Sequence, residues 1–196
     1  MTNNVELIQK LRNQTGAGMM AVKSALDQAG GDESKAVDIL RKKGQKIAAK
    51  KQNEREAKDG LVAAYIHASG KVGAMIVLAC ETDFVAKNEQ FKNLAHEIAM
   101  QVAAMRPEYV SPSDVPADVK EKEMEIYKKQ LKAEGKPQAI WDKIAQGKLD
   151  KFYASVCLLN QPYIKDDKKA IEDLINEATM KLGEKIEVKQ MIVFTL

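Results

Sequence analysis

The sequence LVAAYIHASGKVGAMIVLAC, residues 61–80, predicts a β-hairpin. Residues 61–68 suit a strand, Ser69-Gly70 is a turn signal, and residues 72–80 are apolar at both alternating sets of positions. A strand that is apolar throughout is typical of one covered on both faces. We therefore expect the second strand to be buried on both sides.

The chain that follows the hairpin predicts a long helix that covers it. Residues 91–105 place Phe91, Ile98 and Val102 at helical spacing on one face. Residues 106–116 contain three prolines and predict a connection, because proline lacks a backbone donor. Residues 118–134 predict a charged helix with a narrow apolar seam, which would suit a projecting arm or a partner contact.

The last part of the chain predicts further helices and a final strand. Helices are expected over residues 137–147, 149–160 and 171–182, with Gly147 and Gly183 as stops. The final strand alternates polar residues with Ile186, Val188, Ile192 and Phe194. Strands near residue 60 and at the end of the chain, with helices between them, predict an α+β fold. We expect a small antiparallel sheet of about three strands, covered by helices on one face.

The first part of the chain predicts a separate helical module. Residues 1–45 suit three short helices, divided by glycines at 16, 18, 30 and 31, with the third ending at Gly44. Residues 46–58 are mostly charged or alanine and predict a solvated helical linker. The α+β core is then expected over residues 59–196.

Length and charge limit the class of protein. The 196 residues allow one good-sized core or a small domain beside a larger one. The net charge of +3, from 31 basic and 28 acidic side chains, gives at most weak support for nucleic-acid binding. No apolar run approaches the ~20 residues of a membrane helix, and residues 1–4 lack the pattern of a signal peptide. We therefore expect a cytoplasmic protein.

The residues that usually perform catalysis form no recognisable motif. His67 and His96 have no nucleophile at a triad-like spacing, and Cys80 and Cys157 lie far apart inside apolar stretches, as buried, inert thiols do. Asp166-Asp167 offers too few ligands for a metal and is interpreted as a helix cap. We expect no metal, no cofactor and no enzymatic activity.

Two local patterns indicate a binding surface, and the first is a methionine pair. Met19 and Met20 follow a tight glycine turn, where at most one of them can face the core of the module. An exposed methionine with Arg12 and Lys23 nearby would make a soft apolar contact rimmed by positive charge. The alternative is that both methionines are buried.

The second pattern is ETDFVAKN, residues 81–88, directly after the apolar strand. It places Phe84 beside Asp83 where the strand ends, and binding residues often lie at such positions. From the residues alone, Phe84 could equally belong to the core.

Both patterns resemble the two signature motifs of the elongation factor Ts family. Residues 11–26, LRNQTGAGMMAVKSAL, are similar to its N-terminal motif, and residues 77–87, VLACETDFVAK, are similar to its core motif. The resemblance covers the whole chain in order: a ubiquitin-associated-like three-helix domain, a linker and an α+β core. The length resembles the short members with one core subdomain. For those members the family implies a homodimer, and Ile192 stands where a short relative has a cysteine that can join subunits.

The resemblance implies a guanine-nucleotide exchange factor for elongation factor Tu in protein synthesis. It implies that Phe84 wedges into the nucleotide-binding domain of that GTPase, that Asp83 disturbs the groups that support magnesium, and that GDP is released. The implied contact residues in the core motif and in the N-terminal module and linker are Thr82, Asp83, Phe84, Val85, Arg12, Met19, Met20, Lys23 and Lys51.

Two other classes of function remain as alternatives. The basic excess and the lysine-rich linker would suit an RNA- or ribosome-associated binding module, which should lose RNA steeply as salt rises. A small enzyme could use an unrecognised site at Cys157 or His67, which thiol alkylation would inactivate.

Overall fold

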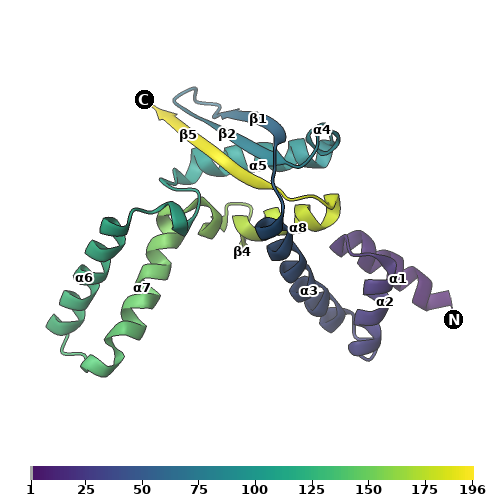
Figure 1. The fold of residues 1–196 in the computed structure, drawn as a ribbon, viewed down its shortest axis with the longest axis horizontal. Helices are drawn as coiled ribbons and strands as arrows, with labels where there is room; N and C mark the ends of the chain where they lie inside the picture. Colours follow the sequence, from purple (N-terminus) through teal and green to yellow (C-terminus); the bar gives the residue numbers. More distant parts are fainter. Residues whose placement is uncertain (1) are drawn as a thin grey trace.

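The computed structural model describes the backbone of residues 2–196, and the side chains of that range apart from residues 2–4, 45–50, 52 and 53. Its centre is an antiparallel sheet in the order β1-β2-β5, built from β1 (Asp59–Ile66), β2 (Val72–Cys80) and β5 (Glu187–Thr195). One face of the sheet is covered by α5 (Glu89–Met105), as expected (Figure 1). The fold is thus α+β, with its core between the sheet and the helices.

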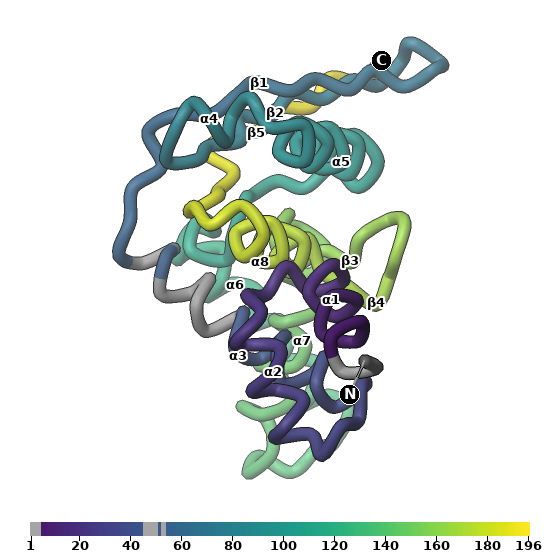
Figure 2. The backbone as a smooth tube through the Cα atoms, turned by 90° about the vertical axis from the view of Figure 1, so that its right-hand side faces the viewer, coloured from purple at the N-terminus to yellow at the C-terminus, as the bar shows by residue number. Residues whose placement is uncertain are grey.

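The helices are stacked on this one face. Figure 2 shows the sheet as the outer layer, α5 beneath it, and α8 (Ile171–Leu182) beneath α5. The buried face of the sheet contributes Ala74, Ile76, Leu78 and Val188, which pack with Phe91, Ile98, Val102, Ile171 and Ile175 from the helices. This cluster is the main hydrophobic core.

The expectation that β2 is buried on both faces is wrong. Ala74, Ile76 and Leu78 are buried, whereas Met75 between them is exposed. The side chains on the far face of the sheet are apolar in the first half of β2 and in the two neighbouring strands, β1 and β5. Apolarity on both faces therefore does not mean that another element of the same chain covers both.

The final strand contains a β-bulge, which changes the expected alternation. Leu78 pairs with Val188 but Val77 pairs with Gln190, so Lys189 is an extra residue. A one-residue slip exchanges the two faces of a strand. Val188 therefore faces the core, whereas Ile192 and Phe194, expected on the same face, are exposed on the other.

The N-terminal module consists of α1 (Thr2–Thr15), α2 (Met19–Gln28) and α3 (Glu33–Glu54) around a small core of its own. The third helix does not end at Gly44 as expected but continues to Glu54. Gly44 is a contact point: a Cβ added there would lie 1.9 Å from Sδ of Met180 on α8. The glycine permits close approach of α3 and α8, so it is not a stop signal.

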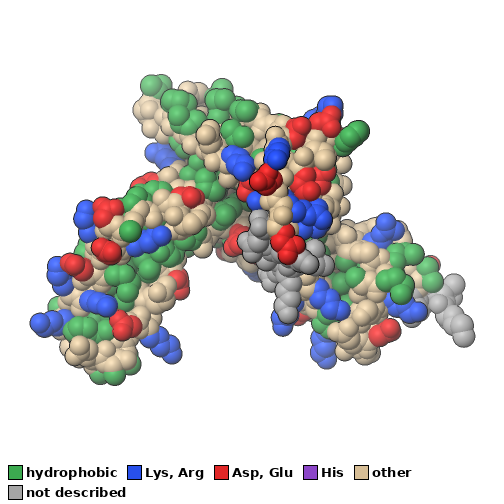
Figure 3. Space-filling model, in the orientation of Figure 1, with side chains coloured by type: hydrophobic (Ala, Val, Ile, Leu, Met, Phe, Trp, Pro, Cys, Tyr) green, Lys and Arg blue, Asp and Glu red, His purple; other side chains and the backbone are tan. Residues whose placement is uncertain are grey.

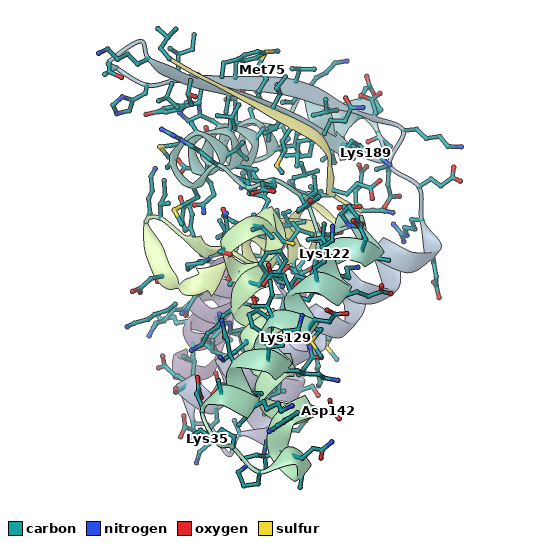
Figure 4. All side chains as sticks on the ribbon, turned by 90° about the vertical axis from the view of Figure 1, so that its left-hand side faces the viewer. Lys35, Met75, Lys122, Lys129, Asp142 and Lys189 are labelled. Atoms are coloured by element: carbon teal, nitrogen blue, oxygen red, sulfur yellow. The ribbon has the colours of Figure 1, made fainter. Side chains whose placement is uncertain are left out.

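An antiparallel pair, α6 (Ala117–Ala133) and α7 (Trp141–Val156), projects from the core as an arm (Figure 1). The expected break at Gly147 is absent, and α7 is one helix, because a single glycine weakens a helix without ending it. Leu131, Ala145 and Leu149 form the narrow buried seam. Lys128 pairs with Asp142 at 3.0 Å across the arm, which Lys122, Lys129 and Asp142 mark in Figure 4.

Short elements connect the arm to the rest of the core. They are the 3-10 turns Pro112–Asp114 and Leu158–Asn160, and a second small sheet of β3 (Pro162–Tyr163) and β4 (Asp166–Ala170). The 3-10 turn Gln138–Ile140 lies within the arm and joins α6 to α7. Asp166 and Asp167 lie in β4, so their interpretation as a helix cap is wrong. The helix α8 ends as expected at Gly183, in the left-handed conformation.

Candidate functional site

The site predicted around Phe84 is a short turn and helix at the end of β2. The strand ends at Cys80, and α4 (Asp83–Ala86) is a single helical turn. Within it, Val85 is half-buried and packs against the core, whereas the ring of Phe84 is 82% exposed. Ala86 packs against the core beside Val85, which leaves Phe84 on the outer side of the turn. Phe84 is therefore not a core residue.

An ion pair between Asp83 and Lys87 flanks Phe84 on the same turn. The Asp83 carboxylate accepts a hydrogen bond from Nζ of Lys87 at 2.6 Å, one helical turn later. This hydrogen bond, together with the lysine charge, lowers the pKa of Asp83 and raises the pKa of Lys87. The site thus presents an exposed aromatic ring beside a carboxylate that is ionised at neutral pH.

The turn before Phe84 is held by a carboxylate from a distant part of the chain. The backbone N–H groups of Glu81 and Thr82 donate to one oxygen of Glu184, at 3.1 and 3.0 Å. The Thr82 hydroxyl donates to the other oxygen at 2.6 Å. From the other side, the Cys80 thiol donates to the Thr82 carbonyl oxygen at 3.2 Å.

Arg55, the residue directly after α3, contacts the same turn through Glu81. Nη1 of Arg55 donates to the two carboxylate oxygens of Glu81 at 3.0 and 3.2 Å, and the Lys185 N–H donates to the same carboxylate at 2.6 Å. Partial burial opposes ionisation of Glu81, but these hydrogen bonds outweigh it and lower the pKa of that carboxyl. The turn is thus tied to both α3 and the loop between α8 and β5.

Lys51, predicted to contact a partner, makes an internal contact here. Its Nζ donates to the Gly183 carbonyl oxygen at 2.6 Å, and the side chain is half-buried. Desolvation, followed by the nearby Arg55 charge, lowers the pKa of Lys51. The residue therefore connects α3 to the end of α8 in this structure.

Both methionines of the N-terminal motif are exposed. Met19 is 55% and Met20 79% exposed, whereas Val22, one turn after Met19 in α2, is fully buried. Lys23 and Arg12 are exposed as well, and Arg12 borders a polar cleft with Lys181 of α8. The alternative with two buried methionines is wrong.

The structure places the two predicted surfaces on one side of the molecule. The α1–α2 module and α4 both face the viewer in Figure 2 and both lie toward the right in Figure 1. Exposed hydrophobic side chains are visible near both in Figure 3. Thr82 and Val85 fix the turn, while Phe84, Met19 and Met20 offer apolar surface. The arrangement is suited to binding one broad surface of another macromolecule.

The residues weighed for catalysis are not grouped. Cys80 and Cys157 are free and buried, and burial raises the pKa of each thiol to about 11, so neither is a reactive thiolate. His67 lies in the β1–β2 turn and His96 on the exposed side of α5. Among the described residues, no three His, Cys, Asp or Glu side chains form a metal cluster, and no helix is long and apolar enough to cross a membrane.

Sequence reasoning missed Glu184 and Arg55. Glu184 lies about a hundred positions after the turn that it contacts, and no local spacing indicates that pairing. The only available signal was its place directly after the helix-ending Gly183, where a loop must return to the sheet.

Comparison with known proteins agrees with this site. The sequence model described as elongation factor TS matches residues 5–196. An elongation factor Ts from Thermodesulfovibrio yellowstonii is 51% identical over 194 residues, covering 99% of this chain and 96% of that protein. One from Coprothermobacter proteolyticus is 51% identical over 196 residues, covering 100% of this chain and 99% of that protein. The chain therefore belongs to the elongation factor Ts family, whose members are nucleotide exchange factors for elongation factor Tu and not catalytic enzymes.

Proposed function

We propose that the chain releases GDP by inserting Phe84 into the nucleotide-binding domain of elongation factor Tu. Asp83 then disturbs the groups that hold magnesium, while Thr82 and Val85 support the turn. The N-terminal module and the linker add contacts to the same domain, from Arg12, Met19, Met20, Lys23 and Lys51, whose ammonium group has further N–H donors beside the one bonded to the Gly183 carbonyl oxygen. The activity itself, nucleotide exchange in cytoplasmic translation, comes with membership of the family.

The physical basis of exchange is a difference in affinity. Suppose that a protein binds the empty GTPase more tightly than it binds the GDP form. By linkage, it must then lower the affinity of the GTPase for GDP by the same factor. The wedge therefore has to occupy space or displace groups that GDP and magnesium need. A ring that binds equally well to both forms would release nothing.

One observation supports Phe84 most directly: a large aromatic side chain is 82% exposed on a turn fixed by several hydrogen bonds. Aromatic residues anchor many interfaces because they bury a large area and lose little side-chain entropy. Here the backbone is already ordered, so little further ordering is needed when the ring is buried.

The test is the release of a fluorescent GDP analogue from elongation factor Tu with and without the chain. Burial of a phenylalanine contributes ~1.5 to 3 kcal/mol, so Phe84→Ala should slow stimulated release by roughly ten- to a hundredfold. The melting temperature should change little, because the ring is already in water. Ile126→Ala, a truncation of an exposed residue on the arm, is the control and should leave release unchanged. Normal release by Phe84→Ala, or early unfolding, would show that the site is elsewhere.

We also propose that the chain is a homodimer formed through the outer face of the sheet. The register aligns three rows across β1, β2 and β5 on that face: Val62, Val77 and Gln190; Ala64, Met75 and Ile192; Ile66, Gly73 and Phe194. Apart from Gln190 the rows are apolar, and none of these residues is charged. Figure 4 shows Met75 on this outer side.

A second copy of the chain is the occupant that suits this surface. Contiguous exposed apolar patches are rare on monomers, and a flat patch without charges can match itself about a two-fold axis. The family resemblance supports the same assembly for short members. Ile192 in the middle row carries no thiol, so the two copies should be held by packing alone.

A further inference from the structure

We infer that Glu184 is the positioning residue for Phe84, an inference that rests on the proposed role of Phe84 in exchange. Its carboxylate accepts three hydrogen bonds, two from the backbone N–H groups of Glu81 and Thr82 and one from the Thr82 hydroxyl, at 2.6 to 3.1 Å. Glu184 is half-buried and comes from the loop between α8 and β5. It would act on the partner only through the turn that it holds.

The short helix α4 needs this outside support. A helix of four residues is far below the length that is stable alone. A threonine at the N-cap usually accepts a hydrogen bond from a backbone N–H of the first turn, yet Thr82 makes no such bond. Its hydroxyl is directed to Glu184 instead. Capping within the helix is thus replaced by a contact to a distant loop.

Besides Glu184, the turn is held by Ala86, which packs against the core, and by Arg55 and the Lys185 N–H, which both contact Glu81. Val85 packs inward, and the Cys80 thiol donates to the Thr82 carbonyl oxygen. These contacts hold the outer end of the strand and one side chain of the helix. The two backbone N–H groups at the strand exit, however, are both directed to Glu184. Glu184 is therefore the side chain that holds both backbone N–H groups where the chain turns from β2 into α4.

The same loop is itself fixed by the end of α3. Lys51 donates to the Gly183 carbonyl oxygen, and Arg55 pairs with Glu81 next to the turn. Glu184 thus lies between a loop anchored by α3 and the turn that presents Phe84. A rigid support of this kind makes the carboxylate a fixed reference point for the ring.

Removal of the carboxylate should act on exchange by loosening the turn. In Glu184→Ala, the two N–H groups and the hydroxyl must form hydrogen bonds with water instead. The loosened turn must then lose conformational freedom when Phe84 is buried in the partner. Stimulated GDP release should fall about tenfold, the effect of losing roughly one charge-assisted hydrogen bond on binding. Glu184→Gln keeps one acceptor oxygen and should recover most of the rate.

A double-mutant cycle separates positioning from general support. Release of fluorescent GDP from elongation factor Tu is measured for the parent chain, Glu184→Ala, Phe84→Ala and the double variant. If Glu184 acts only through Phe84, the Glu184→Ala change should have almost no effect once the ring is absent. Thr82→Val, which removes one of the three hydrogen bonds to Glu184, should give a smaller loss in the same direction, whereas Thr82→Ser, which keeps the hydroxyl, should resemble the parent. Glu177→Ala, which removes an ion pair with Lys169 elsewhere on α8, is the matched control and should leave release unchanged.

The outcomes distinguish this inference from the proposed site. If Phe84→Ala releases GDP normally, the proposed site fails whatever Glu184 does. If Phe84→Ala is slow but Glu184→Ala is normal, or if the two losses simply multiply in the double variant, the positioning role is overturned. A drop in melting temperature without coupling to Phe84 would likewise assign Glu184 to stability alone.

Discussion

Two glycines inside helices look alike in sequence but have opposite roles in packing. Gly147 lies in α7 with open space where a Cβ would be, whereas at Gly44 a Cβ would meet Sδ and Cε of Met180 at 1.9 and 2.3 Å. Gly147→Ala should therefore stabilise the chain by about 0.5 to 1 kcal/mol through helix propensity. Gly44→Ala gains the same propensity but must displace the end of the flexible Met180 side chain, so we expect a smaller gain than for Gly147→Ala.

Urea unfolding of the two alanine variants beside the parent gives the comparison. The free energy of unfolding should rise more for Gly147→Ala than for Gly44→Ala. Equal gains in both variants would show that the Met180 side chain moves aside at no cost.

The two buried thiols predict a dependence of stability on alkaline pH. Burial raises the pKa of Cys80 and of Cys157 from the model-compound value of 9.0 to about 11. A group with a raised pKa stabilises the fold below its unfolded pKa, and that stability is lost as pH rises toward the folded value. The free energy of unfolding should thus fall between about pH 9 and pH 11, by up to ~1.4 kcal/mol per thiol for each pKa unit.

The Cys80→Ala/Cys157→Ala double variant isolates this effect, because tyrosines and lysines titrate in the same range in both proteins. Urea midpoints at pH 8 and pH 10 should differ less in the double variant than in the parent. An identical pH dependence would mean that the thiols are not shielded in the native state.

At the scale of the element, the bulge at Lys189 predicts which deletions β5 tolerates. Without Lys189 the strand becomes regular, with Val188 and Met191 still facing the core. Deletion of Ile192 instead turns Val193 outward and Phe194 inward. We expect the Lys189 deletion to melt near the parent and the Ile192 deletion to melt well below it, although each shortens the strand by one residue. Equal melting temperatures would contradict the assigned faces.

The same strand shows how much of the fold can be predicted from the sequence. The hairpin, α5, α8 and the C-terminal strand follow from hydrophobic periodicity and turn residues, which are local. The bulge does not, because Ile186, Val188, Ile192 and Phe194 all fall on alternate positions, and the polar Gln190 between them does not by itself show a change of face. Only pairing with β2 shows that Lys189 is extra.

Long-range contacts explain the other differences. Gly44 looked like a helix stop because its packing partner, Met180, lies far along the chain. For the site, the motifs indicated Phe84 and the methionines, and their exposure agrees with a binding surface. Glu184 could not be found, since its three hydrogen bonds connect segments about a hundred residues apart.

For the whole molecule, the proposed surfaces lie on different parts of the fold. The helix α4, which carries Phe84, and the α1–α2 module share one side of the molecule, whereas the outer face of the sheet points in another direction (Figures 1 and 2). The apolar rows lie on that outer face. A second copy on the sheet would therefore leave α4 of each chain open to a partner. The chain can then present two Phe84 turns from one assembly.

The dimer is tested by placing a charge in the middle of the outer face. Ile192 is about half exposed in the single chain, so Ile192→Asp should change the stability of the monomer little, but two copies would bury two unpaired carboxylates. Light scattering should report roughly twice 21.7 kDa for the parent and 21.7 kDa for the variant. Ile126→Asp on the arm introduces the same charge away from the sheet and should remain dimeric. Because association stabilises the folded chain by mass action, the melting temperature of the parent should rise with concentration while that of Ile192→Asp stays constant. A parent that scatters as a monomer, or an Ile192→Asp variant that stays paired, would show that the outer face has another occupant.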